Sequence, residues 1–381
     1  MKILMVSVFH YHFFNWVLQL EGAGYEVYWL DVNDSNTYVE KIDFVRQTVK
    51  WEKKIEYPGR YWIKGNLPKL NKFINNFNNR KFIEVFKERL KEIQPDVVQS
   101  FEMHSSCVPI LEEIKKYPKI KWVYSAWGSD LFYYQHEPEK LKDIKAVFKR
   151  LDYMFADCER DSFIAREYGF TGNYLGTFPG GGGFDIHLHK SLINNFEDRN
   201  IILIKGYQGK FGRCNNIMEA LLKIKNELSN YHVVVFGASE DFFKFIEDPR
   251  FQKIKNLEVK SRISGGDVLN LMGKSLIYVG NSISDGIPNS LLEAIIMESF
   301  PIQSNPGGAT AEFIEHGKNG LLIENPESNI EIAGLIKKAI QNLELLKSGI
   351  EYNSKHIKPK LERNYIKEKV LKKYELIERN L

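Results

Sequence analysis

Short apolar runs alternate with longer amphipathic stretches twice along this chain of 381 residues, and four consecutive glycines separate the two series. The first series predicts strands at 2–9, 25–32, 96–101, 119–127 and 152–157, and helices at 12–22, 79–93, 105–117 and 137–150. Strands that alternate with helices of this length favour a parallel, doubly wound sheet.

Residues 179–200 begin with PGGGGFDIHLHK and interrupt this alternation. Four glycines in a row lose too much backbone entropy to lie within a regular element, so they predict a loop with unusual backbone angles or close ligand approach. After this linker the second series predicts strands at 200–206, 231–238, 257–262, 275–281 and 300–304, and helices at 215–228, 288–298 and 309–316. A final helix is expected at 359–379.

The chain is too long for one ordinary core, since domains average about 150 residues. We therefore expect an α/β protein with two Rossmann-like domains, at 1–190 and 191–360, and a C-terminal helix over 361–381 that can pack back on the first domain. Ligands of open α/β sheets bind at the carboxyl ends of the strands, so a cleft between the domains is the expected site.

The three cysteines, Cys107, Cys158 and Cys214, lie far apart and form no C-x-x-C pair. Neither a disulfide framework nor a zinc site is indicated, and a reducing cytoplasm fits this pattern. Polar side chains interrupt the otherwise uncharged stretch 3–20, which disfavours a signal peptide or membrane helix there. We expect a cytoplasmic protein.

Residues 41–92 carry fourteen Lys and Arg against six Asp and Glu, and aromatic residues interleave with them, among them Trp51, Tyr57, Tyr61, Trp62, Phe73 and Phe77. This composition suits contact with anionic lipid headgroups on the inner face of the cell membrane. A solvated face of a variable insertion is the alternative. No nucleic-acid-binding motif accompanies the charge, so we expect no nucleic-acid partner.

The segment DGIPNSLLEA, residues 285–294, predicts an anion site at a helix start. Pro288 favours the first helical position, and the first free amides would lie near Ser290 and Leu291. Asp285 and Glu293 would flank the bound anion, and Gly286 would let the backbone come close. Two acceptors beside a diphosphate suit a nucleotide sugar, although such a pair of acids by itself is a weak signal.

The segment NSISDGIPNSLLEAIIMESFPIQSNPGGATAEFIEHGKNGLLIENPE, residues 281–327, resembles the C-terminal core of family 4 glycosyltransferases. A looser resemblance extends to MKILMVSVF, PDVVQSF and VYSAWGSDLF near the N-terminus. It implies the GT-B fold and a retaining transfer of sugar from a nucleotide diphosphate sugar, such as a UDP sugar, to an acceptor hydroxyl. It implies no metal and no other cofactor.

The resemblance also implies roles for individual residues. Asp285, where the family has Glu, would meet the hydroxyls of the donor sugar, and Glu293 would hold the ribose. The diphosphate would lie against a glycine after the first strand of the second domain and against the turn and helix start: Gly206, Gly286, Ile287, Pro288, Asn289, Ser290 and Leu291.

The family neutralises the diphosphate with a basic pair after that strand, where this chain reads KGYQGKFGRCNN. Lys210 and Arg213 are the candidates, because Tyr207 stands where arginine is common. Cations at these positions would stabilise the departing nucleoside diphosphate. The alternative is that both are surface cations on a loop.

Contacts to sugar or acceptor are possible for His10, His12, Trp127, Asp130 and Gly181. Trp127 stands where many family members have a histidine, and its ring could pack on a sugar, while Asp130 could bind a hydroxyl. A core tryptophan beside a helix-capping aspartate is the alternative, as are ordinary packed or surface roles for both histidines.

The expected function is that of a hexosyltransferase in lipopolysaccharide, O-antigen, capsule or other surface glycan synthesis, with a glycan or lipid-linked acceptor. A soluble acceptor stays open. Alternatives are a GT-B nucleotide-sugar epimerase, a phosphorylase, or a non-catalytic sugar-nucleotide-binding partner of a glycan assembly complex.

Overall fold

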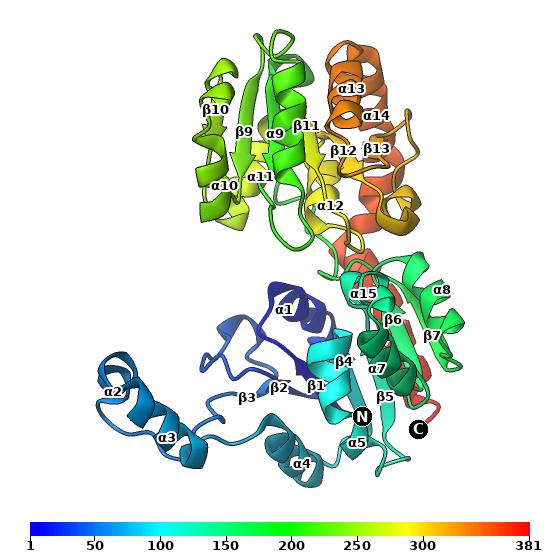
Figure 1. Cartoon of the computed structure of the whole chain (residues 1–381). Coiled ribbons are helices and arrows are strands. Elements are labelled where there is room, and N and C mark those ends of the chain that lie inside the picture. Colours follow the sequence, from blue (N-terminus) through cyan, green and yellow to red (C-terminus); the bar gives the residue numbers. More distant parts are fainter. The chain divides into compact units, whose positions relative to one another are not determined.

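A computed structural model describes residues 1–381 as two compact units (Figure 1). Unit 1 comprises Met1–Ala156, Ala165–Gly176 and Val370–Leu381, and unit 2 comprises Asp157–Ile164 and Thr177–Lys369. Each unit is built around one parallel sheet, as the two series of alternating elements predicted.

The sheet of unit 1 has seven strands in the order β3-β2-β1-β4-β5-β6-β7. Their bounds are β1 (Lys2–Ser7), β2 (Glu26–Asp31), β3 (Arg46–Thr48), β4 (Val97–Phe101), β5 (Lys121–Ser125), β6 (Tyr153–Ala156) and β7 (Asn173–Thr177). The edge strands β3 and β7 were not predicted from the sequence. Buried residues fill the central strands, which is typical of a sheet covered on both faces.

The helices of unit 1 connect these strands. They are α1 (Tyr11–Val17), α2 (Arg60–Asn66), α3 (Pro68–Asn78), α4 (Phe82–Ile93), α5 (Leu111–Ile114), α6 (Ser129–Phe132) and α7 (Pro138–Phe148). Helix α8 (Glu159–Glu167) begins in unit 2 and, from Ala165 on, belongs to unit 1. The helix predicted at 105–117 is broken into a π-turn, a 3-10 turn and α5. Pro109 lies in that 3-10 turn, and its missing amide cannot continue the α-helical hydrogen bonds.

The last helix, α15 (Arg363–Glu378), ends in unit 1, where Val370, Tyr374 and Ile377 on one side of it are buried. The Trp16 indole donates a hydrogen bond to the Tyr374 hydroxyl over 3.0 Å, and that hydroxyl donates to Gln99 over 2.7 Å. This buried relay fixes the C-terminus against α1 and β4. No helix of the protein has both the length and the apolar character needed to cross a membrane.

The sheet of unit 2 has six strands in the order β10-β9-β8-β11-β12-β13. Their bounds are β8 (Ile201–Lys205), β9 (His232–Phe236), β10 (Leu257–Val259), β11 (Ser275–Gly280), β12 (Phe300–Ser304) and β13 (Leu321–Ile323). The helices are α9 (Cys214–Lys223), α10 (Glu240–Ile246), α11 (Gly265–Lys274), α12 (Asn289–Ile296), α13 (Asn329–Ile340) and α14 (Leu343–Tyr352).

The prediction of a helix at 309–316 is wrong. Two 3-10 turns, Pro306–Gly308 and Thr310–Glu312, occupy this place. Gly307 and Gly308 both have positive φ, which an α-helix does not allow.

The expected domain boundary at residue 190 differs from the division of the structure, because the chain first enters unit 2 at Asp157. Cys158 is fully buried in the same core as Leu203 and Leu291. The amides of Glu159 and Arg160 donate to the carboxylate of Glu312, over 2.7 and 3.0 Å. This packing makes 157–164 part of the second unit.

Candidate active site

The candidate donor site lies at the carboxyl ends of β8 and β11 in unit 2. β8 lies between β9 and β11, so the order of the strands reverses at this point of the sheet. At such a reversal the loops that follow the two neighbouring strands run in opposite directions, which opens a crevice between them. Open α/β sheets bind their ligands in this crevice. Lys205 ends β8, and the loop from β11 to α12 contains Asp285.

Helix α12 begins one residue later than predicted, at Asn289. Pro288 is its N-cap, with extended backbone angles of φ −61° and ψ 126°. The carbonyl of Pro288 accepts the amides of Leu291 over 3.0 Å and Leu292 over 3.3 Å. Leu291 therefore does not offer its amide to an anion, in contrast to the prediction, and the positive end of the helix dipole lies at Asn289 and Ser290.

Asp285 and Glu293, the two predicted acids, lie on the loop before α12 and on its second turn. Both are half-buried. Burial raises the pKa of Asp285, and it raises the pKa of Glu293 to about 7, while the charge of Lys205 lowers the pKa of both carboxyls. One cation thus acts on two carboxyls that burial has moved toward their neutral forms.

Lys205 was not among the predicted site residues. It is half-buried, and its ammonium lies 5.1 Å from the ring centre of Tyr207. Lys210 and Arg213 belong to the loop after the strand, whereas Lys205 is the last residue of the strand itself. A charged residue at the carboxyl end of an otherwise buried parallel strand is the signal that could have found it.

Arg160 is a second residue that the sequence analysis missed. Its buried guanidinium donates to the carbonyl of Asp285 over 2.9 Å and to the carbonyl of Pro306 over 2.7 Å. The same group makes two bonds to Asp161, over 3.0 and 2.8 Å. Arg160 therefore joins the loops that follow β11 and β12.

Gly286 is required by close packing. A Cβ atom at this position would lie 2.2 Å from both carboxylate oxygens of Asp157. The Gly286 amide donates to the side chain of Asp285 over 3.0 Å. The backbone here comes close to a carboxylate of the protein itself, which is a different reason for glycine from the ligand approach that we predicted.

Several other predicted donor residues have close contacts within the protein. Ile287 and Leu291 are buried in the core, and Tyr278 donates to the Ser290 hydroxyl over 2.8 Å. Gly181 lies beside α12, because a Cβ atom there would be 3.0 Å from the Asn289 side-chain nitrogen. At Gly206 a Cβ atom would lie 2.8 Å from the carbonyl oxygen of Phe236.

In unit 1, His10, His12 and Trp127 form an aromatic cluster at the carboxyl edge of the sheet. The two imidazole rings stack, with centroids 4.6 Å apart and planes at 11°. Trp127 lies 5.2 Å from His10 and 5.9 Å from His12. Burial lowers the pKa of His10. The structure therefore brings these three predicted residues together, although they come from the segments after β1 and β5.

Two glycosyltransferase families match the sequence, one for each half of the chain. Residues 188–356 match glycosyl transferases group 1, and residues 2–158 match the glycosyl transferase 4-like family. The chain is a glycosyltransferase. Its two parallel-sheet, Rossmann-like domains have the GT-B fold.

Solved structures with the same fold share little sequence with this glycosyltransferase. Sucrose-phosphate synthase from Thermosynechococcus elongatus is 13% identical, with a TM-score of 0.74 and full coverage of both chains. HepE from Anabaena, in complex with UDP-glucose, is 13% identical, with a TM-score of 0.71, 99% coverage of this chain and 100% of the other. The lipopolysaccharide outer core galactosyltransferase WaaB is 15% identical, with a TM-score of 0.67 and 99% coverage of both. No curated protein sequence matches the chain.

Lys210 and Arg213, the predicted basic pair, lie on the loop between β8 and α9 and have different surroundings. Arg213 forms an ion pair with Glu327 and donates to the carbonyls of Gly209 and Gly212 over 3.1 and 2.9 Å. It therefore closes its own loop. Lys210 is exposed, with its ammonium 5.4 Å from the ring centre of Phe211.

Asp130 is buried in the first turn of α6. Its carboxylate accepts the amides of Met103 over 2.9 Å and Trp127 over 3.0 Å, and the Tyr124 hydroxyl over 2.6 Å. These bonds engage the carboxylate within unit 1 and hold the backbone of Trp127 in place.

Asp157, Cys158 and Asp161 form a group that the sequence analysis did not predict, with one potential metal-ligand atom of each within 4.8 Å of the others. The Asp161 carboxylate forms a buried ion pair with Arg160 at 2.8 Å. Burial raises the pKa of the Cys158 thiol, which disfavours the thiolate that a metal would need. These features favour a structural ion pair over a cation site.

Proposed function

We propose that this glycosyltransferase moves a hexose from a UDP sugar to an acceptor hydroxyl, with retention at the anomeric carbon, in the synthesis of a bacterial surface glycan. The main support for the donor site is the position of Lys205. Its charge lowers the pKa of both Asp285 and Glu293, which lie beside the start of α12. Two acceptors, one cation and one helix dipole suit a sugar, a ribose and the diphosphate between them.

In this proposal each group has one task. Glu293 accepts hydrogen bonds from the ribose hydroxyls, and Asp285 accepts them from the sugar. Lys205 and the N-terminus of α12 hold the diphosphate and stabilise the charge that it gains as it leaves. Lys205 replaces the expected pair of loop cations, and the site needs no metal ion.

Retention follows if the acceptor attacks on the face from which the diphosphate departs. The acceptor oxygen forms a bond to the anomeric carbon as the bond from that carbon to the phosphate oxygen breaks. The acceptor proton passes to the leaving phosphate, so no protein nucleophile is required. The protein contributes orientation and charge stabilisation. In unit 1, His10, His12 and Trp127 offer an apolar ring surface for a sugar or acceptor.

Two solved structures with this fold support the choice of donor and product class. HepE has been seen with UDP-glucose, and WaaB is a lipopolysaccharide galactosyltransferase. The basic and aromatic segment within 41–92 favours a lipid-linked acceptor at a membrane surface over a soluble one.

Proton NMR of the purified enzyme with UDP-glucose, UDP-galactose and UDP-N-acetylglucosamine, each with and without a detergent extract of bacterial lipid-linked glycans, tests the proposal. We expect one donor to give UDP and an α-linked product, and only when the extract is present. EDTA should not change this turnover, and the Glu293→Gln variant should lose it. A β-linked product would contradict retention. Epimerisation of the donor without extract would indicate an epimerase. Turnover that requires inorganic phosphate would indicate a phosphorylase, and UDP binding without any turnover would indicate a non-catalytic partner.

A further inference from the structure

Helices α2 and α3 form a hairpin that lies apart from the sheet of unit 1 (Figure 1). Neither helix contains a buried residue. The large apolar side chains that the hairpin exposes are Tyr61, Trp62, Leu67, Leu70, Phe73 and Phe77. A soluble protein rarely exposes so many adjacent aromatic and aliphatic side chains unless another surface covers them.

The apolar residues of α3 lie on one face. Leu70, Phe73, Ile74 and Phe77 follow the spacing i, i+3, i+4, i+7, which places them in a single stripe along the helix. The rings of Phe73 and Phe77 contact each other edge to face, with centroids 5.2 Å apart. The other faces of α3 are polar. A short helix with this division is typical of segments that lie in the plane of a membrane interface.

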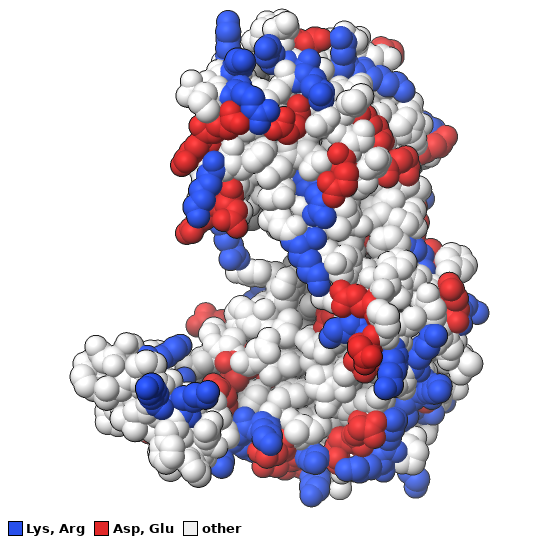
Figure 2. All heavy atoms as spheres, in the orientation of Figure 1, with Lys and Arg blue, Asp and Glu red and all other residues white.

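The charge of the hairpin has one sign. Residues 57–83 contain no Asp or Glu, and their cations are Arg60, Lys64, Lys69, Lys72, Arg80 and Lys81. Figure 2 shows cations beside uncharged surface on this projecting segment. Lys69 and Lys72 lie on α3 outside its apolar stripe. Cations around an exposed apolar stripe complement an anionic lipid surface, where the headgroups are negative and the boundary beneath them is apolar.

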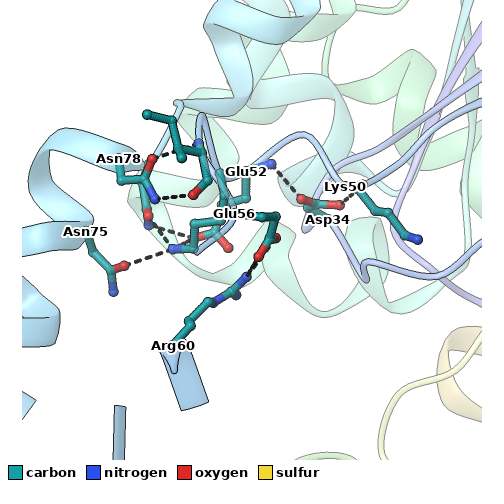
Figure 3. A network of polar contacts seen from close by, with 10 residues as sticks. Asp34, Lys50, Glu52, Glu56, Arg60, Asn75 and Asn78 are labelled. Carbon is teal, nitrogen blue, oxygen red and sulfur yellow. Dashed lines mark hydrogen bonds and ion pairs between the residues drawn. The ribbon is translucent and has the colours of Figure 1, made fainter. Parts of the chain in front are cut away.

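The base of the hairpin is held firmly to unit 1 (Figure 3). Asn78 exchanges two hydrogen bonds with the backbone of Ile55, over 2.9 and 2.8 Å. The Lys53 ammonium is mostly buried and bonds to Asn75 over 3.0 Å and to Glu52 over 3.3 Å. The Asp34 carboxylate accepts the amide of Glu52 over 2.5 Å. Hydrogen bonds between 52–55 and 75–79 therefore fix the base of the hairpin that carries the exposed stripe.

We propose that the α2–α3 hairpin is a membrane-docking element, which lays the stripe of α3 and the aromatic side chains of α2 into the headgroup boundary of an anionic bilayer. This inference deepens the proposed function and rests on it only for the lipid-linked acceptor. Docking would bring the enzyme to the surface that carries such an acceptor, and it would do so without a membrane-spanning helix.

Trp62 is a built-in reporter for this docking. It is 63% exposed, whereas Trp16, Trp29, Trp51 and Trp122 are buried and Trp127 is half-buried. Titration with vesicles of phosphatidylglycerol and phosphatidylcholine should shift its emission to the blue, and lipids brominated near the headgroup should quench it. Vesicles of phosphatidylcholine alone should bind at least about tenfold more weakly. Equal binding to both would overturn the electrostatic part of the proposal.

Two double variants separate the apolar and the electrostatic contributions, measured by vesicle sedimentation. Phe73→Ser with Phe77→Ser should lower partitioning about 100-fold, and Lys69→Gln with Lys72→Gln about 30-fold. The matched controls in unit 2 are Ile330→Ser and Lys244→Gln, which remove an exposed apolar residue and an exposed cation elsewhere and should leave partitioning unchanged.

The proposal is overturned if the phenylalanine variant binds vesicles like the wild type. It is also overturned if light scattering shows that the wild type is a dimer and that the phenylalanine variant is a monomer, because a second copy would then cover the stripe. UDP binding by both double variants distinguishes the two hypotheses. Wild-type affinity for UDP with lost vesicle binding supports docking, whereas absence of UDP binding in the wild type contradicts the donor site alone.

Discussion

The guanidinium of Arg160 donates to the backbone carbonyl of Asp285 over 2.9 Å and to that of Pro306 over 2.7 Å. One buried side chain thereby joins the loop after β11, which carries a proposed donor-binding acid, to the loop after β12, which carries the glycine pair. Hydrogen bonds from a charged group to backbone carbonyls are among the stronger ones. Arg160 is therefore a positioning residue for the donor site.

We predict that loss of these bonds weakens donor binding. The double variant Arg160→Gln with Asp161→Asn removes the ion pair as a whole, so that no single charge stays buried without its partner. The Kd for UDP, measured by calorimetry, should rise about tenfold as the Asp285 loop loses its support. Arg250→Ala is the control, because that exposed arginine pairs with Glu219 and Asp248 and touches none of the proposed donor-site residues through these ion pairs. Unchanged UDP affinity in the double variant would refute this role.

Gly286→Ala should destabilise the protein by about 1–3 kcal/mol, because its Cβ atom would overlap the Asp157 carboxylate. Urea denaturation measures this loss. Adding Asp157→Ala to Gly286→Ala should cost less than the sum of the two single changes, since it makes room for the new methyl group. Strictly additive costs would show that the overlap is relieved elsewhere.

We predict that Lys205, and not Lys210, contributes to the affinity for the diphosphate of UDP. Lys205→Gln should weaken UDP binding by about tenfold or more while leaving uridine binding nearly unchanged, because only the diphosphate meets the ammonium. Lys210→Gln is the matched control and should change neither affinity by more than about twofold, since that side chain is exposed. The reverse pattern would restore Lys210 as the phosphate-binding cation.

Glu293 should make stability depend on pH. Its pKa is raised by burial from an ordinary value of 4.5 to about 7. Between these values the native carboxyl keeps a proton that the unfolded chain has lost, so this group's contribution to stability falls as the pH rises. The free energy of unfolding of the wild type, relative to Glu293→Gln, should therefore drop by about 1–3 kcal/mol from pH 5 to pH 7.5. A constant difference would contradict the raised pKa.

The fold was predictable from the sequence where strands are buried on both faces. The apolar runs at 2–9 and 275–281 became β1 and β11, because central parallel strands read as continuous apolar segments. The edge strands β3 and β7 are short and only partly buried, so their sequences carry no such signal. The glycine pair Gly307 and Gly308 excluded the α-helix that was expected after β12.

The site was predictable only as far as local sequence determines it. Asp285 and Glu293 are eight residues apart on one loop and helix, so their proximity follows from the chain itself. Lys205 and Arg160 reach the same place from 80 and 125 residues away, by tertiary packing that spacing cannot reveal. The ion pair of Arg213 with Glu327 could not be predicted either, because the two residues are likewise distant in sequence.

Thermal unfolding with a panel of nucleoside diphosphates and nucleotide sugars, for the wild type and for Glu293→Ala, tests the donor site most directly. A ligand at 100 times its Kd should stabilise the folded protein by about 2.7 kcal/mol. The proposal predicts a clear rise in the Tm of the wild type with UDP, and a loss of that rise in the variant. An equal rise in both proteins, or no rise with any nucleotide, would contradict a donor site at the start of α12.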